Sequence, residues 1–359
     1  MRISAVDSFI LRIPPNPPLD KVFQVPHLVV ATIRTDQGLA GLGYTLLLGG
    51  RGTEAVQRYL QVELAPLLVG EDPQFVERLW EKMYRSDLGI RRQGLAGLSL
   101  SALDIGLWDI AGKAANLPLY KLWGAALDRV PAYGSGGFPA YSHDELVGEI
   151  ERFMAMGCRY YKMKVHDPDP RVNRKRVEEV VRAIDGRARV MVDCNQRFDV
   201  LANVRQARML AEFDLVWYEE PVLADDIAAC ADVARAIAIP VATGENNFNR
   251  YEFRELIERR AASYLMPDVC RANGFSEVRR IGQLAAAYEL PITPHLVPEL
   301  SIQLAASLSN SFLVEIMAWM PDDVFDGVPK CEDGCFRLTD RPGHGLALAP
   351  DAKRKYGLV

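Results

Sequence analysis

The sequence predicts an α/β protein in which an N-terminal α+β domain is followed by a (β/α)8-type barrel. From Val130 to about Glu315, strand-like and helix-like patterns alternate, and a polar residue ends nearly every strand. Parallel strands joined mostly by helices close into a barrel whose strand ends meet at one rim. The alternative is a doubly wound open sheet, which would gather its ligand-binding residues at one switch point.

The chain has a different rhythm before residue 128. Strand-like runs over residues 3–13 and 28–34 precede helical patterns over residues 53–68, 73–84 and 95–115. Strands followed by a run of helices are typical of an α+β domain. We therefore expect an N-terminal domain over residues 1–127, a barrel over 128–320, and a segment over 321–359 that returns to the first domain.

The barrel prediction rests on eight strand candidates. Proline residues open two of them, at Pro240 and Pro291, and amphipathic helical patterns separate most of them. The expected strand ends are Gly134, Lys164, Asp193, Glu219, Glu245, Asp268, His295 and Glu315.

Composition excludes several classes of protein. The 359 residues carry a net charge of −5, with 49% hydrophobic and 25% charged residues, which is ordinary for a globular protein. A pI of about 5.7 without a basic stripe argues against nucleic-acid binding. The chain shows neither an uninterrupted apolar run of membrane-spanning length nor an N-terminal signal core, so we expect a cytoplasmic protein. The six scattered cysteines then favour free thiols, and Cys331 and Cys335 lack two nearby partners for a zinc site.

Three acidic residues recur at equal intervals. Asp193, Glu219 and Glu245 each follow a short apolar run, 26 residues apart. Equivalent strand ends of successive βα units meet at one barrel rim, where three carboxylates would repel one another without a cation. Three hard oxygen ligands with room for water and substrate suit Mg²⁺ best. A helix N-cap is the alternative explanation for each acid alone, but the equal spacing disfavours it.

Two further strand ends offer groups that transfer protons. Lys162 and Lys164 alternate along one strand and can point into the same barrel mouth, where we expect them to depress each other's pKa. Asp268 and His295 end adjacent strands, and a carboxylate beside an imidazole orients the ring. A lysine on one wall and a His–Asp pair on the other suit abstraction of a proton α to a carboxylate.

These motifs together resemble the enolase superfamily, mandelate racemase subgroup. The resemblance covers essentially the whole chain, and its strength lies in the order and spacing of the motifs. They are Lys162-x-Lys164, Asp193-x-Asn195, Glu219-Glu220-Pro221, Gly244-Glu245-Asn246, Asp268 and His295, with residues 101–109 similar to the family's helix that leads into the barrel.

The resemblance implies a fold and a set of roles. The fold is an α+β capping domain on a modified (β/α)7β barrel. Asp193, Glu219 and Glu245 would bind Mg²⁺, with Glu220 as the alternative to Glu219. Lys164 and His295, oriented by Asp268, would be the bases on opposite faces of the substrate. Lys162 and Asn195 would hold the substrate carboxylate, and Glu315 would hydrogen-bond one of its oxygens.

Two loops of the first domain match the family's specificity loops, which close over the substrate. His27 and Arg51 are their candidate substrate-binding residues. The sequence departs from the family after Asp268, where Arg271 is expected to alter the charge near His295. A lysine is absent at position 268, which disfavours an amino-acid racemase or a muconate-cyclising enzyme.

The activity that the resemblance implies is Mg²⁺-dependent dehydration of a sugar acid, an aldonate or aldarate, through an enediolate to a 2-keto-3-deoxy acid. A 2-hydroxy-acid racemase or epimerase, or a cycloisomerase of an anhydro- or lactone-type sugar acid, would use the same site. A non-enzymatic binding protein is disfavoured because every acid/base and metal position is retained. The expected partners are a small carboxylate substrate and further copies of the chain, as a dimer or octamer.

Overall fold

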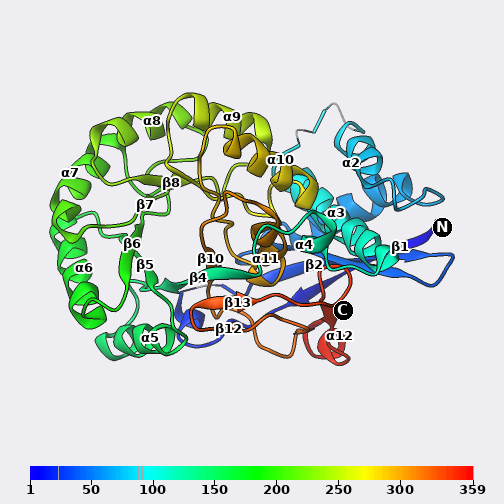
Figure 1. The fold of residues 1–359 in the computed structure, drawn as a ribbon, viewed down its shortest axis with the longest axis horizontal. Helices are drawn as coiled ribbons and strands as arrows, with labels where there is room; N and C mark the ends of the chain where they lie inside the picture. Colours follow the sequence, from blue (N-terminus) through cyan, green and yellow to red (C-terminus); the bar gives the residue numbers. More distant parts are fainter. Residues whose placement is uncertain (23, 87–88, 91, 359) are drawn as a thin grey trace.

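The structure is a computed structural model that describes residues 1–22, 24–86, 89–90 and 92–358. Figure 1 shows a ring of alternating strands and helices on one side and a smaller sheet with its helices on the other. The ring contains residues from the middle of the chain. The smaller part comes from the N-terminal region, and both ends of the chain lie beside it.

The N-terminal part, called the capping domain below, is a three-stranded antiparallel sheet covered by helices. The sheet order is β1-β2-β3. A short 3-10 turn at Leu19–Lys21 interrupts the connection between the first two strands. The strands are β1 (Ile3–Arg12), β2 (His27–Thr35) and β3 (Ala40–Leu47), and the helices are α1 (Thr53–Tyr59), α2 (Val76–Tyr84), α3 (Gly94–Ala115) and α4 (Leu119–Leu122). The helical pattern predicted to 68 continues past α1 as a π turn and a 3-10 turn.

Strand β3 was not predicted, because glycines break its pattern. Gly41 and Gly43 lie in its interior, where glycine is normally unfavourable. Helix α3 passes so close that a Cβ at Gly43 would lie 2.0 Å from the carbonyl oxygen of Ala102, and one at Gly41 would lie 2.1 Å from that of Gly106. The glycines therefore permit direct contact between the strand and the helix.

Helix α3 is the centre of the capping domain and its link to the barrel. It is long and apolar enough to cross a membrane, but 72% of its apolar window is buried inside the protein, as in a core helix. Its Asp104 is fully buried and accepts hydrogen bonds from the N–H (2.9 Å) and the hydroxyl (2.6 Å) of Ser276. Ser276 lies in the first turn of α10, a barrel helix, so α3 supplies the capping group that α10 lacks in its own sequence.

The barrel is a modified (β/α)7β barrel, which confirms the fold expected from the resemblance. Strands β4 to β9 pair in parallel in chain order, and β10 pairs with β4 to close the ring. The strands are β4 (Arg129–Gly136), β5 (Tyr160–Lys164), β6 (Arg189–Asp193), β7 (Tyr218–Glu219), β8 (Val241–Thr243), β9 (Tyr264–Leu265) and β10 (Val314–Ile316). The helices between them are α5 (His143–Ala155), α6 (Pro170–Ile184), α7 (Val200–Leu210), α8 (Ile227–Ala236), α9 (Arg250–Glu258), α10 (Gly274–Ala286) and α11 (Pro298–Ser307).

The strand expected to end at His295 is reduced to isolated bridges. Ile292 pairs in parallel with Leu265 on one side and with Ser311 on the other. The ring is therefore continuous at this point, although the segment is too short to count as a strand.

Aromatic side chains fill the interior of the barrel below its rim. Trp217 packs against Tyr133 and Tyr264, with ring centroids 5.4 Å apart in both pairs, and Phe312 lies against Tyr264 and Tyr160. The barrel is thus a packed core rather than a pore.

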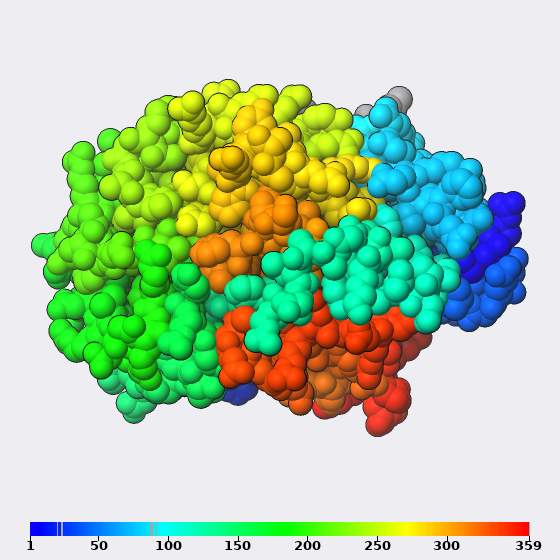
Figure 2. Space-filling model, viewed as in Figure 1, coloured from blue at the N-terminus to red at the C-terminus, as the bar shows by residue number. Residues whose placement is uncertain are grey.

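The C-terminal segment contacts both parts of the molecule. Its strand β13 (Cys335–Arg337) pairs antiparallel with β4, whereas the N–H of Leu358 donates to Ile10 in β1. Figure 2 shows this segment, in orange-red, lying against the teal region around residues 110–130, where Pro118 and Gly343 form a bridge. Its other elements are β11 (Phe325–Asp326), β12 (Cys331–Glu332), β14 (Ala347–Leu348) and α12 (Ala352–Tyr356).

The contact between β3 and α3 predicts a steric effect. Gly43→Ala places a methyl group on a backbone carbonyl that cannot move aside, so it should lower the free energy of unfolding by about 1–3 kcal/mol or more. Urea denaturation measures the change. Gly148→Ala is the control: it lies in α5, where the new methyl group would meet no atom within 4 Å beyond the nearby backbone of its own helix, and it should leave stability equal or slightly higher. Equal stability of the two variants would contradict the packing argument.

Asp104 predicts a pH effect. Burial raises its pKa to about 7, despite the hydrogen bonds from Ser276 that lower it. Because this folded-state pKa lies above the ordinary value of 3.8, the folded protein binds more protons between pH 4 and 7, and this group's contribution to stability falls as pH rises through that window. Asp104→Asn should therefore gain stability relative to the wild type between pH 5 and pH 8, measured by urea denaturation at each pH. A difference between the two proteins that does not change with pH would refute this assignment.

Candidate active site

Three carboxylates converge at the barrel rim, as the spacing predicted. Oxygen atoms of Asp193, Glu219 and Glu245 lie within 4.8 Å of one another, and all three residues are buried. Their strands β6, β7 and β8 are neighbours. The N-caps of the helices that follow are other residues, Asp199, Asp226 and Asn249, so the three carboxylates are not needed as caps.

The electrostatics of this trio suit a bound cation. Burial favours the neutral form of Asp193, but Lys164 and Lys162 outweigh it and lower its pKa to about 2. Burial and the charge of Asp193 instead raise the pKa of Glu219 well above its usual range. Without a divalent ion, keeping three carboxylates charged at this separation costs a large free energy, because they repel one another and are shielded from water. An all-oxygen set of this kind fits Mg²⁺, whereas Cys331 and Cys335 belong to no such group among the described residues.

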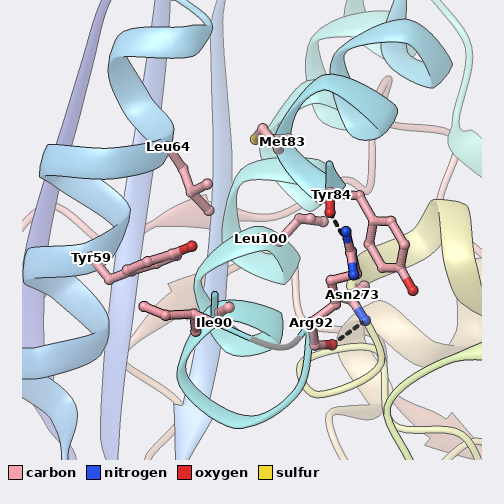
Figure 3. A pocket seen from close by; sticks show the side chains of 9 residues that line it. Tyr59, Leu64, Met83, Tyr84, Ile90, Arg92, Leu100 and Asn273 are labelled. Atoms are coloured by element: carbon pink, nitrogen blue, oxygen red, sulfur yellow. Dashed lines mark hydrogen bonds between the residues drawn. The ribbon is translucent and has the colours of Figure 1, made fainter. Parts of the chain in front are cut away.

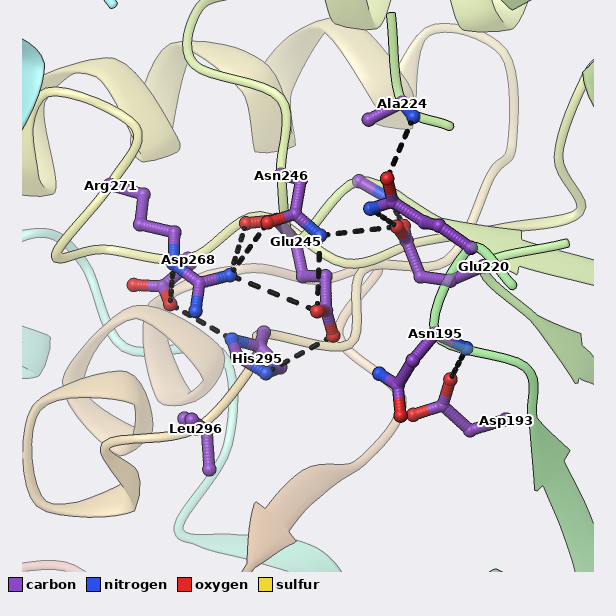
Figure 4. A network of polar contacts seen from close by, with 12 residues as sticks. Asp193, Asn195, Glu220, Ala224, Glu245, Asn246, Asp268, Arg271, His295 and Leu296 are labelled. Carbon is purple, nitrogen blue, oxygen red and sulfur yellow. Dashed lines mark hydrogen bonds and ion pairs between the residues drawn. The ribbon is translucent and has the colours of Figure 1, made fainter. Parts of the chain in front are cut away.

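Glu220, the alternative to Glu219, faces away from the trio. Its Oε1 accepts from the N–H of Gly244 at 2.9 Å, and its Oε2 accepts from the amides of Gln196 and Asn246 at 2.5 and 3.2 Å. Glu220 therefore supports the loop that carries Glu245 (Figure 4).

The two lysines of β5 reach the trio from one side. Lys164 Nζ donates to Asp193 Oδ2. Lys162 Nζ is fully buried and lies 2.6 Å from Glu219 Oε1 and 3.0 Å from Glu315 Oε1. The expected depression of the Lys162 pKa is wrong. Burial does lower it, but Glu219 and Glu315 outweigh burial and raise the pKa well above its usual value.

His295 and Asp268 form the expected pair on the other side. His295 Nδ1 lies 2.8 Å from Asp268 Oδ2, and Nε2 lies 3.1 Å from Glu245 Oε2. The second oxygen of Asp268 accepts from the N–H of Cys270 at 2.7 Å, which fixes the carboxylate. Burial lowers the His295 pKa, but Glu245 and Asp268 raise it further, so the net shift is upward.

Glu315, in β10, is fully buried, like Asp193 and Glu219. Its Oε2 accepts from the N–H of Leu296 at 2.9 Å. Lys162 holds the pKa of Glu315 below its usual value, although burial opposes this. An ionised carboxylate accepts hydrogen bonds, so donation to a substrate oxygen would require Glu315 to take up a proton.

A cavity of about 540 Å³ opens above these groups. Lys164 and His295 both line it, together with Asn195 and Glu245. The rest of its wall is Lys21, Val22, Leu48, Phe138, Pro139, Ala140, His166, Arg197, Leu296 and Met317. The predicted substrate residues His27 and Arg51 are not among its lining residues; His27 Nδ1 instead lies 3.1 Å from the Thr53 hydroxyl.

His166 also lines the cavity, although it was not among the predicted site residues. Its Nε2 lies 2.9 Å from Asn195 Oδ1. Burial lowers its pKa to about 4, so it is neutral near pH 7. Its position two residues after Lys164 was the only signal in the sequence.

The loop after His295 is held in an unusual conformation. Leu296 and Val297 have φ values of +47° and +39°, which residues other than glycine rarely adopt. Such backbone strain persists only where the surroundings enforce it, and it is common at functional sites. Here the hydrogen bond from Leu296 to Glu315 is one of the enforcing contacts.

A second cavity, inside the capping domain, is too small to hold more than about one water (Figure 3). Tyr59, Tyr84 and Ile90 are among its lining residues, at about 10 Å³ of free space. On its wall, Arg92 donates to the carbonyl of Tyr84 and accepts at its own carbonyl from Asn273. This cavity is a packing feature of the capping domain, to whose wall the barrel contributes Asn273.

Comparison with known proteins gives matches over the whole chain. Residues 15–124 match the mandelate racemase / muconate lactonizing enzyme N-terminal domain, and residues 145–352 match the enolase C-terminal domain-like family. The L-talarate/galactarate dehydratase of Salmonella typhimurium is 33% identical over 91% of this chain and 82% of its own length. The 3,6-anhydro-alpha-L-galactonate cycloisomerase of Streptomyces coelicolor is 33% identical over 90% and 89% of the two chains.

A solved structure agrees with the fold. A racemase from Streptomyces coelicolor, crystallised with bound magnesium, superposes with a TM-score of 0.94 at 31% identity and covers 99% of this chain and 100% of its own. The matching domains, relatives and fold confirm the resemblance drawn from the motifs. The chain belongs to the mandelate racemase subgroup of the enolase superfamily.

Proposed function

We propose that this protein dehydrates a sugar acid, an aldonate or aldarate, in a reaction that requires Mg²⁺. The α-proton leaves first, the β-hydroxyl departs as water, and the resulting enol becomes a 2-keto-3-deoxy acid. One observation carries the proposal: Lys164 and His295 line the same cavity, Lys164 in contact with Asp193 and His295 in contact with Glu245. The α-carbon of a substrate bound in this cavity would then have a proposed proton-transfer group on either face.

Asp193, Glu219 and Glu245 would hold Mg²⁺, which when bound supplies positive charge beside the substrate carboxylate as negative charge develops there. Lys164, on the β5 side, is the proposed base for the α-proton. Asn195 lines the cavity next to Lys164 and is placed to hold a substrate oxygen. Lys162 remains a proposed carboxylate-binding residue, although its Nζ is already committed to Glu219 and Glu315.

His295 is the proposed acid. Asp268 accepts from Nδ1, which favours the protonated ring and directs Nε2 away from Asp268. Donation of the Nε2 proton to the β-hydroxyl lets it leave as water while the electrons of the broken Cα–H bond form the new double bond. Glu315 is proposed to support this arrangement by fixing Lys162 and the Leu296 amide.

Cycloisomerisation is the second candidate. It is favoured by the identity with the 3,6-anhydro-alpha-L-galactonate cycloisomerase, which equals that with the dehydratase. A ring oxygen would then leave in place of water, with the same proton donor and acceptor. Racemisation would need only Lys164 and His295, each acting on its own face.

The reaction itself is the first test. Purified protein with Mg²⁺ in D₂O is incubated with a panel of aldonates, aldarates, anhydro sugar acids and 2-hydroxy acids, and followed by proton NMR. A 2-keto-3-deoxy product supports dehydration. An isomer with an opened ring supports the cycloisomerase, and deuterium at Cα without net product supports racemisation. Complete inertness, including the absence of Cα exchange, would count against catalysis of this class.

Removal of either proton-transfer group should slow turnover strongly. Lys164→Ala and His295→Asn should each reduce kcat by about 10²–10⁴-fold, the usual contribution of a positioned acid or base. Steady-state kinetics on the substrate from the panel measure this. Lys330→Ala and His143→Asn, at exposed positions, are the matched controls and should keep wild-type rates. Wild-type turnover in the double variant would refute both roles.

Mg²⁺ should stabilise the fold through the carboxylate trio. Because the ion relieves repulsion among buried carboxylates, Mg²⁺ at about 100 times its Kd should stabilise the protein by about 2.7 kcal/mol. Thermal unfolding with and without Mg²⁺ measures the shift. Glu219→Gln should remove most of it. Asp226→Asn, which keeps an N-cap on α8, should retain it. An equal Mg²⁺ shift in the Glu219→Gln protein would contradict the proposed ligand set.

A further inference from the structure

Arg271 lies between Glu245, a proposed metal ligand, and Asp268, which orients His295 (Figure 4). Its Nη1 donates to the main-chain oxygen of Glu245 at 2.9 Å and to Asn246 Oδ1 at 3.2 Å. The same Nη1 lies 3.8 Å from Glu245 Oε1, and Nε lies 3.5 Å from Asp268 Oδ2. One guanidinium thus touches the loop of a candidate metal ligand and the carboxylate that orients His295.

These contacts close a ring of four residues. His295 contacts Asp268 through Nδ1 and Glu245 through Nε2, and Arg271 contacts the same two carboxylates from the other side. A displacement of either carboxylate therefore changes the geometry of both. We infer that Arg271 is a positioning residue that fixes Glu245 for Mg²⁺ and Asp268 for His295 at the same time. This inference rests on the proposed function for the roles of Glu245 and His295.

The planar fork of arginine matters as well as its charge. Nε and Nη1 point at different partners, which a lysine ammonium on a flexible stem cannot reach together. Lys162 and Lys164 approach the trio from β5. Among the residues that the structure describes, the cationic groups within 4 Å of the Glu245 carboxylate are Arg271 and His295.

The capping domain fixes the loop that carries Arg271. Thr45, in β3, donates to the carbonyl of Cys270 at 2.8 Å. Trp80, in α2, donates to the carbonyl of Asn273 at 2.9 Å, and the Asn273 amide donates to the carbonyls of Phe248 and Arg92. The backbone on both sides of Arg271 is therefore anchored, so the guanidinium meets Glu245 and Asp268 from a fixed base.

Mg²⁺ affinity distinguishes positioning from charge, because the two effects have opposite signs. Loss of a cation 3.8 Å from Glu245 should by Coulomb's law tighten Mg²⁺ binding, whereas loss of positioning should weaken it. Outer-shell partners of metal ligands typically contribute 10–100-fold to metal affinity. We expect Arg271→Met to weaken Mg²⁺ binding by about 10-fold or more in calorimetric titration of the whole protein without substrate.

Arg271→Lys is the decisive second variant, because it keeps the charge and loses the fork. It should also bind Mg²⁺ about 10-fold more weakly than the wild type, and it answers the question alone if Arg271→Met fails to fold. The matched control is Arg250→Met, which removes a partly buried arginine paired with Glu277 at the contact between α9 and α10. Its Mg²⁺ affinity should stay within about twofold of the wild type.

Two results would overturn the inference. One is unchanged or tighter Mg²⁺ binding in Arg271→Met, and the other is wild-type affinity in Arg271→Lys. The titration needs no substrate, so it is independent of the activity proposed above. Weakened Mg²⁺ binding in a protein that converts no sugar acid would uphold the position of Arg271 at Glu245 and reject the proposed reaction.

Discussion

The balance of buried charge at the barrel mouth constrains everything else in the structure. Six carboxylates lie buried there, those of Asp193, Glu219, Glu220, Glu245, Asp268 and Glu315. Such a cluster is tolerated only where hydrogen bonds and cations surround it. The lysines of β5 pair with the carboxylates on one side, and Arg271 pairs with those on the other. Backbone N–H groups of short loops donate further hydrogen bonds to them. The barrel supplies this arrangement because it brings the ends of distant segments together.

The capping domain is part of this arrangement as well as a cover over it. The segment from Asp268 to Ser276 carries a proposed catalytic carboxylate at one end and a helix N-terminus at the other. The capping domain contacts it through Thr45, Trp80 and Asp104. Asp104 is buried and accepts a hydrogen bond from Ser276. Because a buried hydrogen bond requires a defined geometry, this contact fixes the orientation of α10 relative to the capping domain. The position of Asp268 therefore depends on residues more than 150 positions earlier in the chain.

Much of the fold and site could be predicted because barrel geometry converts spacing along the chain into proximity. Asp193, Glu219 and Glu245 could be brought together from their equal intervals alone, and β4 to β10 follow hydrophobic runs. Strand β3 could not be predicted, because its glycines are required by the close approach of α3, which the sequence does not reveal. The raised pKa of Lys162 depends on carboxylates from two other strands, and the reach of Arg271 depends on side-chain direction. Neither leaves a periodic signal in the sequence.

The wall of the cavity comes from two parts of the chain, the connections of the capping sheet and the ends of the barrel strands. Lys21, Val22 and Leu48 come from two connections of the capping sheet, and they take no part in anchoring the Asp268–Ser276 segment. Substitution there would alter the shape offered to a ligand and leave the proposed proton-transfer groups where they are. These two connections can therefore change the ligand that fits the cavity without moving the proposed proton-transfer groups. A dehydratase and a cycloisomerase are both 33% identical to this chain, so one such scaffold serves ligands of different shape.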